Sequence, residues 1–198
     1  MSTVSIAQKV VSDAQICQGD IYKDVHYSYI NDDTDDSIEI VDYTFPTAIV
    51  ISQACDVDFM SKILDSGSGK VNKFMPAILM CPIYDKDEAR KMSHLDDAFR
   101  ELNIEKEIDK TNPSLFNSRE KDIIDKDWHY RFHSLTVQYK DGIVIENALI
   151  DFKHYFTVPA SYLYRNRKNR LFHLESLFAE QITLKFSTYL SRVAIPEG

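Results

Sequence analysis

Glycine is scarce in this chain, with five residues among 198, and no segment has the glycine spacing of a phosphate-binding loop or a nucleophile elbow. Those loops need glycine because the backbone must approach a phosphate closely or turn sharply. The sequence also lacks a helical motif built on two carboxylates. It therefore gives no support to ATP-dependent, esterase or well-known protease activities.

Cysteine and long apolar runs are also in short supply. Cys17, Cys55 and Cys81 are odd in number and widely spaced, which indicates reduced thiols rather than a disulfide framework. No apolar run reaches the roughly 18 to 20 residues that a membrane-spanning helix needs. The N-terminal residues do not show the basic segment followed by an apolar segment that is typical of a secretion signal. We therefore expect a cytoplasmic protein that makes no contact with a membrane.

The residues that are present favour a folded chain. Apolar residues make up 44% and aromatic residues 12% of the sequence. A chain of this length buries a real core but is short for two ordinary domains. We predict an α+β fold with one domain over residues 15–198, a flexible segment at 1–14 and a charged, helical insertion at about 85–127.

Four apolar segments predict a mostly β core. Residues 21–30 are rich in Tyr, Val and Ile, and residues 38–44 alternate between apolar and polar. Residues 47–53 and 77–81 contain uninterrupted apolar runs, which are typical of strands buried on both faces. We expect 38–44 to pair with 47–53. The acidic run between residues 31 and 36 has no apolar side chain to bury and is predicted to be a surface loop.

The second half of the chain predicts a hairpin and helices. Residues 129–139 and 143–152 flank Lys140-Asp141-Gly142, a sequence that favours a tight turn between two strands. Apolar residues recur at helical spacing from 85 to about 107, and again from 174 to 193. The last of these stripes is wide enough to hold an amphipathic helix against a sheet.

Only a local basic patch could bind nucleic acid, because the net charge of −8 repels phosphates. One segment, which follows a helical turn opened by Pro159, has this character, and its cations are Arg165, Arg167, Lys168 and Arg170. Tyr162, Tyr164 and Phe172 flank it and could stack on bases. A solvated loop before the last helix explains the same segment. Arg192 is a further candidate for anion binding, although a structural role at the helix C-terminus suffices for it.

The end of the buried strand at 47–53 is a candidate for reactive chemistry, because scaffolds often present functional groups where a strand stops. Cys55 and Asp56 lie there. A nucleophilic Cys needs a lowered pKa, whereas a neighbouring Asp favours the thiol. The competing interpretation is that Cys55 fills the core and Asp56 caps the following turn.

His129, Arg131 and His133 are spaced by two, so on a strand all three would share one face. His133 could act there as a general acid or base near neutral pH, and Arg131 could contact phosphate. A metal would also need a carboxylate nearby, which the sequence does not place. We expect no metal and no cofactor, and a solvated strand face accounts for these residues equally well.

The order of elements resembles the MazF/PemK-like toxin superfamily. Gly19-Asp20-Ile21 opens a strand, Ala48 to Ser52 forms a buried strand and Pro76 to Pro82 another, followed by a hairpin and a terminal helix. The resemblance covers most of the chain outside the insertion. Cys55-Asp56 and Arg192-Val-Ala-Ile-Pro196 also resemble a pattern in bacterial proteins of uncharacterised activity. The resemblance implies a small SH3-like barrel and, in that family, metal-independent cleavage of single-stranded RNA.

The resemblance predicts a protein that binds RNA or a protein partner in a bacterial toxin–antitoxin or phage-defence system. The family typically has Arg before the proline that here follows Phe45, so cleavage would belong to an altered ribonuclease. Its catalytic residues would be Cys55, Asp56, Arg131 and His133. The alternative is a noncatalytic interaction module of a bacterial conflict or defence operon. The residues leave open whether the chain is an enzyme and whether it forms a homodimer.

Overall fold

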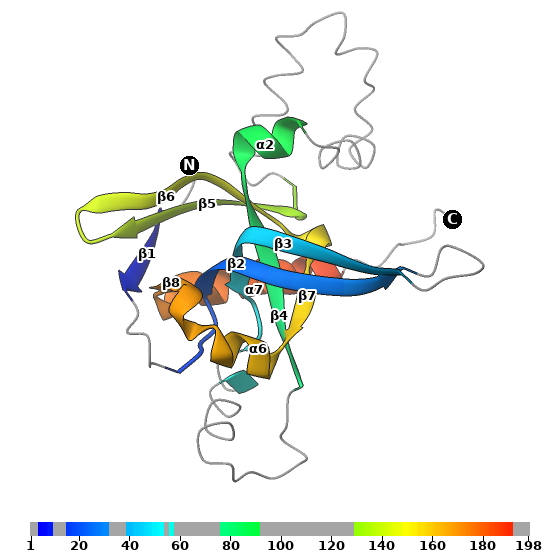
Figure 1. The fold of residues 1–198 in the computed structure, drawn as a ribbon. Helices are drawn as coiled ribbons and strands as arrows, with labels where there is room; N and C mark the ends of the chain where they lie inside the picture. Colours follow the sequence, from blue (N-terminus) through cyan, green and yellow to red (C-terminus); the bar gives the residue numbers. More distant parts are fainter. Residues whose placement is uncertain are drawn as a thin grey trace, which may run out of the picture.

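The computed structural model describes residues 4–9, 15–31, 39–53, 56–57, 76–91 and 129–191 (Figure 1). Strands dominate this part of the chain. They are β1 Val4–Lys9, β2 Asp20–Asn31, β3 Glu39–Val50, β4 Ala77–Asp85, β5 Phe132–Tyr139, β6 Gly142–Asp151, β7 Phe156–Pro159 and β8 Arg170–Leu174. The helical elements are α2 Lys86–Lys91, η2 Phe152–His154, α6 Ala160–Arg165, η3 Arg167–Asn169 and α7 Ser176–Leu190.

The strands close into a barrel-like ring. Hydrogen-bonded neighbours follow the order β3-β2-β8-β1-β5-β6-β4, and a further pairing of β3 with β4 completes the ring. β4 serves three neighbours because successive parts of it pair with β7, β3 and β6. The expected α+β class and a barrel-like sheet are therefore confirmed.

The uninterrupted apolar run in β3 divides between two cores. Ile49 and Ile51 belong to an inner cluster that fills the barrel and packs against α7. Ala48 and Val50 belong to an outer cluster, which β7 and α6 cover. All four side chains are at most 2% exposed. Because successive strand residues point to opposite faces, a strand between two cores must be apolar at every position.

Gly19 fixes α7 against the start of β2. Its φ of +84° lies in the left-handed region, which favours glycine. Its amide donates to the Val50 carbonyl at 2.9 Å. A Cβ built on Gly19 would lie 2.6 Å from the Cβ of Ala179, so the helix approaches the backbone here more closely than any side chain allows.

β1 forms in a part of the chain for which we expected a flexible segment. It pairs in parallel with β5 and antiparallel with β8. Ser5 and Ala7 are its buried residues, at 4% exposure each, whereas Val4 and Ile6 are 41% and 43% exposed. Small residues face inward and large ones outward, so the usual alternation signal is inverted and the strand was not predicted.

β3 also differs from the expectation that 38–44 and 47–53 form two strands paired with each other. This prediction was wrong, because one continuous strand pairs with β2 along most of its length. Proline has no backbone N–H to donate. The β2–β3 ladder goes from the pair Lys23–Thr47 to the pair Val25–Phe45, so Pro46 and Asp24 between them are not paired in the ladder. Asp24 has a φ of +52° at this point.

The predicted hairpin, the turn after Pro159 and the last helix are confirmed. Tyr139 pairs with Gly142 across the two-residue loop Lys140-Asp141, and Lys140 has a φ of +53°. α6 follows Pro159 directly. α7 buries Ala179, Ile182 and Phe186. The acidic loop lies outside the described residues. Of the insertion at 85–127, the structure describes only residues 85–91, which contain α2.

We expect Gly19→Ala to lower the free energy of unfolding by about 2 to 4 kcal/mol, because the new Cβ overlaps Ala179 and the left-handed backbone is strained. Chemical denaturation measures this. Gly142→Ala is the matched control, since no atom lies within 4 Å of its added Cβ. Equal stability of the two variants would contradict the close approach of α7.

Candidate nucleic-acid surface and buried ion pairs

A buried ion pair joins β2 to β8 beside the basic segment. The side chains of Asp20 and Arg170 are each 1% exposed, and Arg170 Nη1 donates to Asp20 Oδ2 at 2.8 Å. Asp20 also accepts from the Cys17 amide at 2.8 Å and lies 3.0 Å from His173 Nδ1. Charges at this depth persist only with such partners. Arg170 was predicted to bind nucleic acid, but its charge is directed into the protein.

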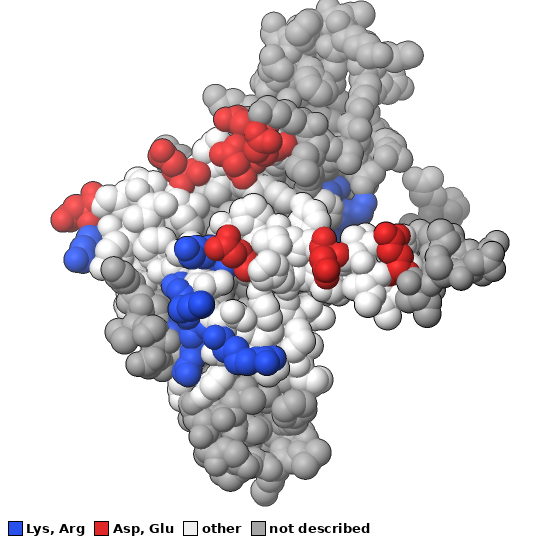
Figure 2. All heavy atoms as spheres, viewed as in Figure 1, with Lys and Arg blue, Asp and Glu red and all other residues white. Residues whose placement is uncertain are grey.

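The other cations of the segment lie at the surface. Arg165 and Lys168 are exposed and Arg167 is half-buried. These three residues form the basic surface, and Figure 2 shows Lys and Arg side chains gathered over α6 and η3. The sequence from 152 to 174 contains no Asp or Glu. The basic surface therefore has no carboxylate of its own segment to neutralise it.

Two tyrosines of α6 border the basic surface. The Arg167 guanidinium carbon lies 4.1 Å from the centroid of the Tyr164 ring, a cation–π arrangement. The Tyr162 hydroxyl accepts from the His26 amide at 2.9 Å, which holds this ring against β2. Both tyrosines are half-buried and pack on the outer core. Phe172, the third predicted aromatic, packs against the inner core and does not join them.

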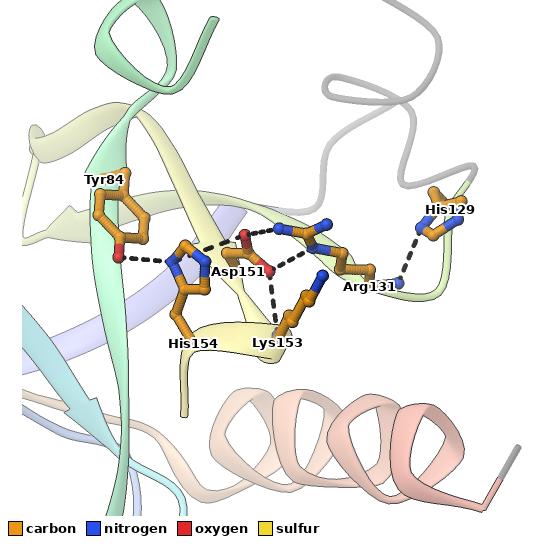
Figure 3. A network of polar contacts seen from close by, with 6 residues as sticks. All are labelled: Tyr84, His129, Arg131, Asp151, Lys153 and His154. Atoms are coloured by element: carbon orange, nitrogen blue, oxygen red, sulfur yellow. Dashed lines mark hydrogen bonds and ion pairs between the residues drawn. The ribbon is translucent and has the colours of Figure 1, made fainter. Parts of the chain in front are cut away.

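A second buried ion pair involves Arg131 (Figure 3). Its Nε and Nη2 donate to the two carboxylate oxygens of Asp151 at 2.7 and 2.6 Å, and the side chains are 3% and 0% exposed. This bidentate geometry uses the Nε–Nη2 edge of the guanidinium, whose donors could otherwise bind a phosphate. Arg131, predicted to contact phosphate, therefore has a structural partner.

The predicted strand face of His129, Arg131 and His133 does not exist. This prediction was wrong because β5 begins only at Phe132, and the preceding residues form a bend in which His129 Nδ1 accepts from the Arg131 amide at 3.2 Å. His129 and Arg131 are buried, at 1% and 2% exposure, so the region does not present a solvated cationic face. The spacing by two does not place the three side chains on one face, because His129 and Arg131 precede the strand and only His133 lies within it.

His133 contacts the last helix instead. The Lys185 ammonium on α7, which has only donors, lies 3.1 Å from His133 Nδ1. Both side chains are half-buried. Arg131 and His133 therefore have different partners in the structure, on β6 and α7 respectively, and do not form one catalytic pair.

Asp151 connects its ion pair to the protein surface. His154 Nδ1 lies 3.9 Å from Asp151 Oδ2 and 2.9 Å from the Tyr84 hydroxyl, and the His154 side chain is 37% exposed (Figure 3). Burial, followed by the negative charge of Asp151, raises the pKa of Tyr84 well above its ordinary value, so its hydroxyl stays protonated. No local sequence pattern indicates this network, since Tyr84 and His154 are 70 residues apart.

The remaining predicted site residues are not brought into a site by the described structure. Cys55 and Arg192 lie outside the described residues. Asp56 is exposed, and its amide donates to the Gln53 carbonyl at 3.2 Å. Cys81 is completely buried, and burial raises the pKa of its thiol far above the usual value, so this cysteine stays protonated.

A cavity of about 300 Å³ is bordered by β3, β4, β6 and β8. Asp85 and Glu146 line it together with Tyr84. Its carboxylates disfavour a polyanionic ligand. The residues placed by the structure include no group of three or more His, Cys, Asp or Glu side chains that could hold a metal ion. No helix within the described ranges is long and apolar enough to cross a membrane.

Comparisons with known proteins add no family. No protein-family model, curated protein or solved structure matches the chain.

Asp151→Asn should lower the free energy of unfolding by roughly 3 to 5 kcal/mol, because the buried Arg131 charge loses its counter-ion. Denaturant titration gives the value. The control is Asp24→Asn, which breaks the exposed Lys23–Asp24 pair at 4.0 Å and should cost less than about 1 kcal/mol. A small effect of Asp151→Asn would show that the pair contributes little to stability.

Proposed function

We propose that this protein binds single-stranded RNA through the basic surface, on a barrel of the MazF/PemK-like type. One observation carries the proposal. Arg165 and Lys168 are exposed and Arg167 is half-buried in a stretch without carboxylates, whereas the neighbouring Arg170 is held inside by Asp20. Cations at the surface are available to phosphates, which supply most of the affinity of nucleic-acid binding.

The overall charge of −8 does not prevent this binding, because electrostatic attraction is local. Salt screens exposed charges beyond roughly 8 to 10 Å at physiological ionic strength. In the view of Figure 2, most acidic side chains lie near α2, over the β5–β6 hairpin and along the β2–β3 hairpin, and one acidic group adjoins the basic side chains. Arg167 itself lies in a segment with three further cations and no carboxylate, which favours a phosphate beside it.

The aromatic border favours unpaired strands over duplexes. Tyr162 and Tyr164 are half-buried residues, so part of each remains accessible, and Arg167 lies over the Tyr164 ring. Bases of a single strand expose their faces and can stack on such rings, whereas bases in a duplex cannot. With three cations, we expect a dissociation constant of roughly 10⁻⁴ to 10⁻⁶ M at physiological salt, as for other nonspecific complexes.

The structure supports binding better than cleavage. The guanidinium of Arg131 is committed to Asp151, and His133 contacts Lys185 on another element. General acid–base cleavage needs its groups within reach of one phosphodiester. An RNA-binding protein that has lost cleavage would suit an altered member of a toxin–antitoxin or phage-defence system.

Replacing Arg165, Arg167 and Lys168 together by Gln should weaken binding to a fluorescent single-stranded RNA and flatten its salt dependence. The slope of log K against log salt is negative, and each lost phosphate contact should reduce its magnitude by about 0.7. Fluorescence anisotropy at several salt concentrations measures both quantities, and gel analysis of the same samples should show intact RNA.

Lys140→Gln provides the matched control, because it removes one exposed cation from the β5–β6 turn rather than from the basic surface. It should leave the affinity and the slope unchanged. Equal binding by wild type and the triple variant would disprove the assignment of the surface. Cleavage of the RNA by the wild-type protein would instead restore the ribonuclease hypothesis.

A further inference from the structure

The distal parts of β2 and β3 project from the barrel as a two-stranded ribbon (Figure 1). β2 pairs with β8 at Asp20–Tyr22, and β3 pairs with β4 at Ala48–Val50. Beyond these points, among the residues that the structure describes, the two strands pair only with each other. Residues 25–31 and 39–45 form this ribbon, which is called the arm below.

One face of the arm continues the outer core into solvent. Directly paired residues share a face, so the pairs Val25–Phe45, Tyr27–Tyr43 and Tyr29–Val41 form a ladder. Phe45 is 8% exposed and stacks on Phe156 at 4.4 Å between ring centroids, whereas Tyr43 and Tyr29 are 46% and 45% exposed. The Tyr27 and Tyr29 rings are themselves stacked at 5.9 Å. The ladder is therefore ordered and open at its outer end.

The opposite face of the arm is apolar at one position only. Ile30 and Ile40 are paired there and are 67% and 68% exposed. An isolated two-stranded ribbon is marginally stable in water, and contiguous exposed apolar surface commonly marks an interaction site. A partner that covers the tyrosine ladder would stabilise the arm.

The charge of the arm decides which partner fits. Glu39 and Asp42 are its described acids, and the sequence from Asp24 to Thr47 contains seven acidic residues and no Lys or Arg. Phosphates would be repelled here, so the arm is unsuited to RNA. A cationic segment, by contrast, would meet the Glu39 carboxylate together with the tyrosine rings on one face, and guanidinium groups favour both.

We infer that the arm docks an Arg-rich segment of a partner protein, with guanidinium groups lying on the rings of Tyr29 and Tyr43. This inference goes beyond RNA binding, because it assigns a second macromolecular partner to a surface of opposite charge. Glu39, paired with Asn31, lies on the ladder face and supplies the attraction, whereas Asp42 is paired with Ser28 on the opposite face. The rings supply the contact area, so both salt and ring removal should weaken the complex.

The test uses a fluorescent peptide in which Arg alternates with Ser, and the same peptide with Glu in place of Arg. The wild-type protein should bind the Arg peptide and not the Glu peptide. Tyr29→Ser combined with Tyr43→Ser should weaken binding about five- to thirtyfold, the effect of losing two cation–π contacts. Anisotropy gives the affinities, and the unfolding midpoint shows whether the variant is folded.

Ile30→Ser combined with Ile40→Ser is the control on the opposite face and should leave peptide affinity unchanged. Equal losses in both double variants, or no binding of the Arg peptide by the wild type, would overturn the inference. Self-association that disappears in the Arg165, Arg167 and Lys168 triple variant would identify a second copy of this chain as the occupant. Loss of RNA binding in the tyrosine variant would assign the arm to RNA instead.

Discussion

The buried pair of Asp20 and Arg170 sets the arrangement on which the functional surface depends. It fixes the beginning of β2 to the beginning of β8, at the point where the chain leaves η3. A charge with 1% exposure must be paired, so Arg170 cannot turn outward. The cations just before it, on α6 and η3, are consequently held at the surface by a rigid strand rather than carried on a mobile loop.

This pair also marks the limit of what the sequence could predict. Apolar runs and turn residues are local signals, and they correctly predicted the doubly buried strand at Ala48–Val50, the β5–β6 hairpin and α7. The sequence showed four similar cations between 165 and 170, but not that Arg170 meets an acid 150 residues away. Arg131 was misassigned for the same reason, since its partner Asp151 is the last residue of the β5–β6 hairpin. β1 was missed because its large side chains point outward.

The protein separates its charges into two surfaces. Cations gather at α6 and η3, whereas the arm carries acids and tyrosines without a single Lys or Arg. Net charge alone would have excluded nucleic acid, but the local distribution does not. An anionic ligand at the basic surface and a cationic one at the arm would not compete for the same groups. The two proposals can therefore fail or succeed independently.

The central claim is that RNA lies on the basic surface, and photo-crosslinking tests it most directly. The full-length protein would be irradiated with single-stranded RNA containing 4-thiouridine, and the crosslinked peptides would be identified by mass spectrometry. The account predicts adducts within residues 161–170, at Tyr162 or Tyr164 beside the exposed cations. Adducts confined to the arm or to the cavity lined by Asp85 and Glu146 would contradict it, and so would the absence of any adduct under conditions in which the RNA is bound.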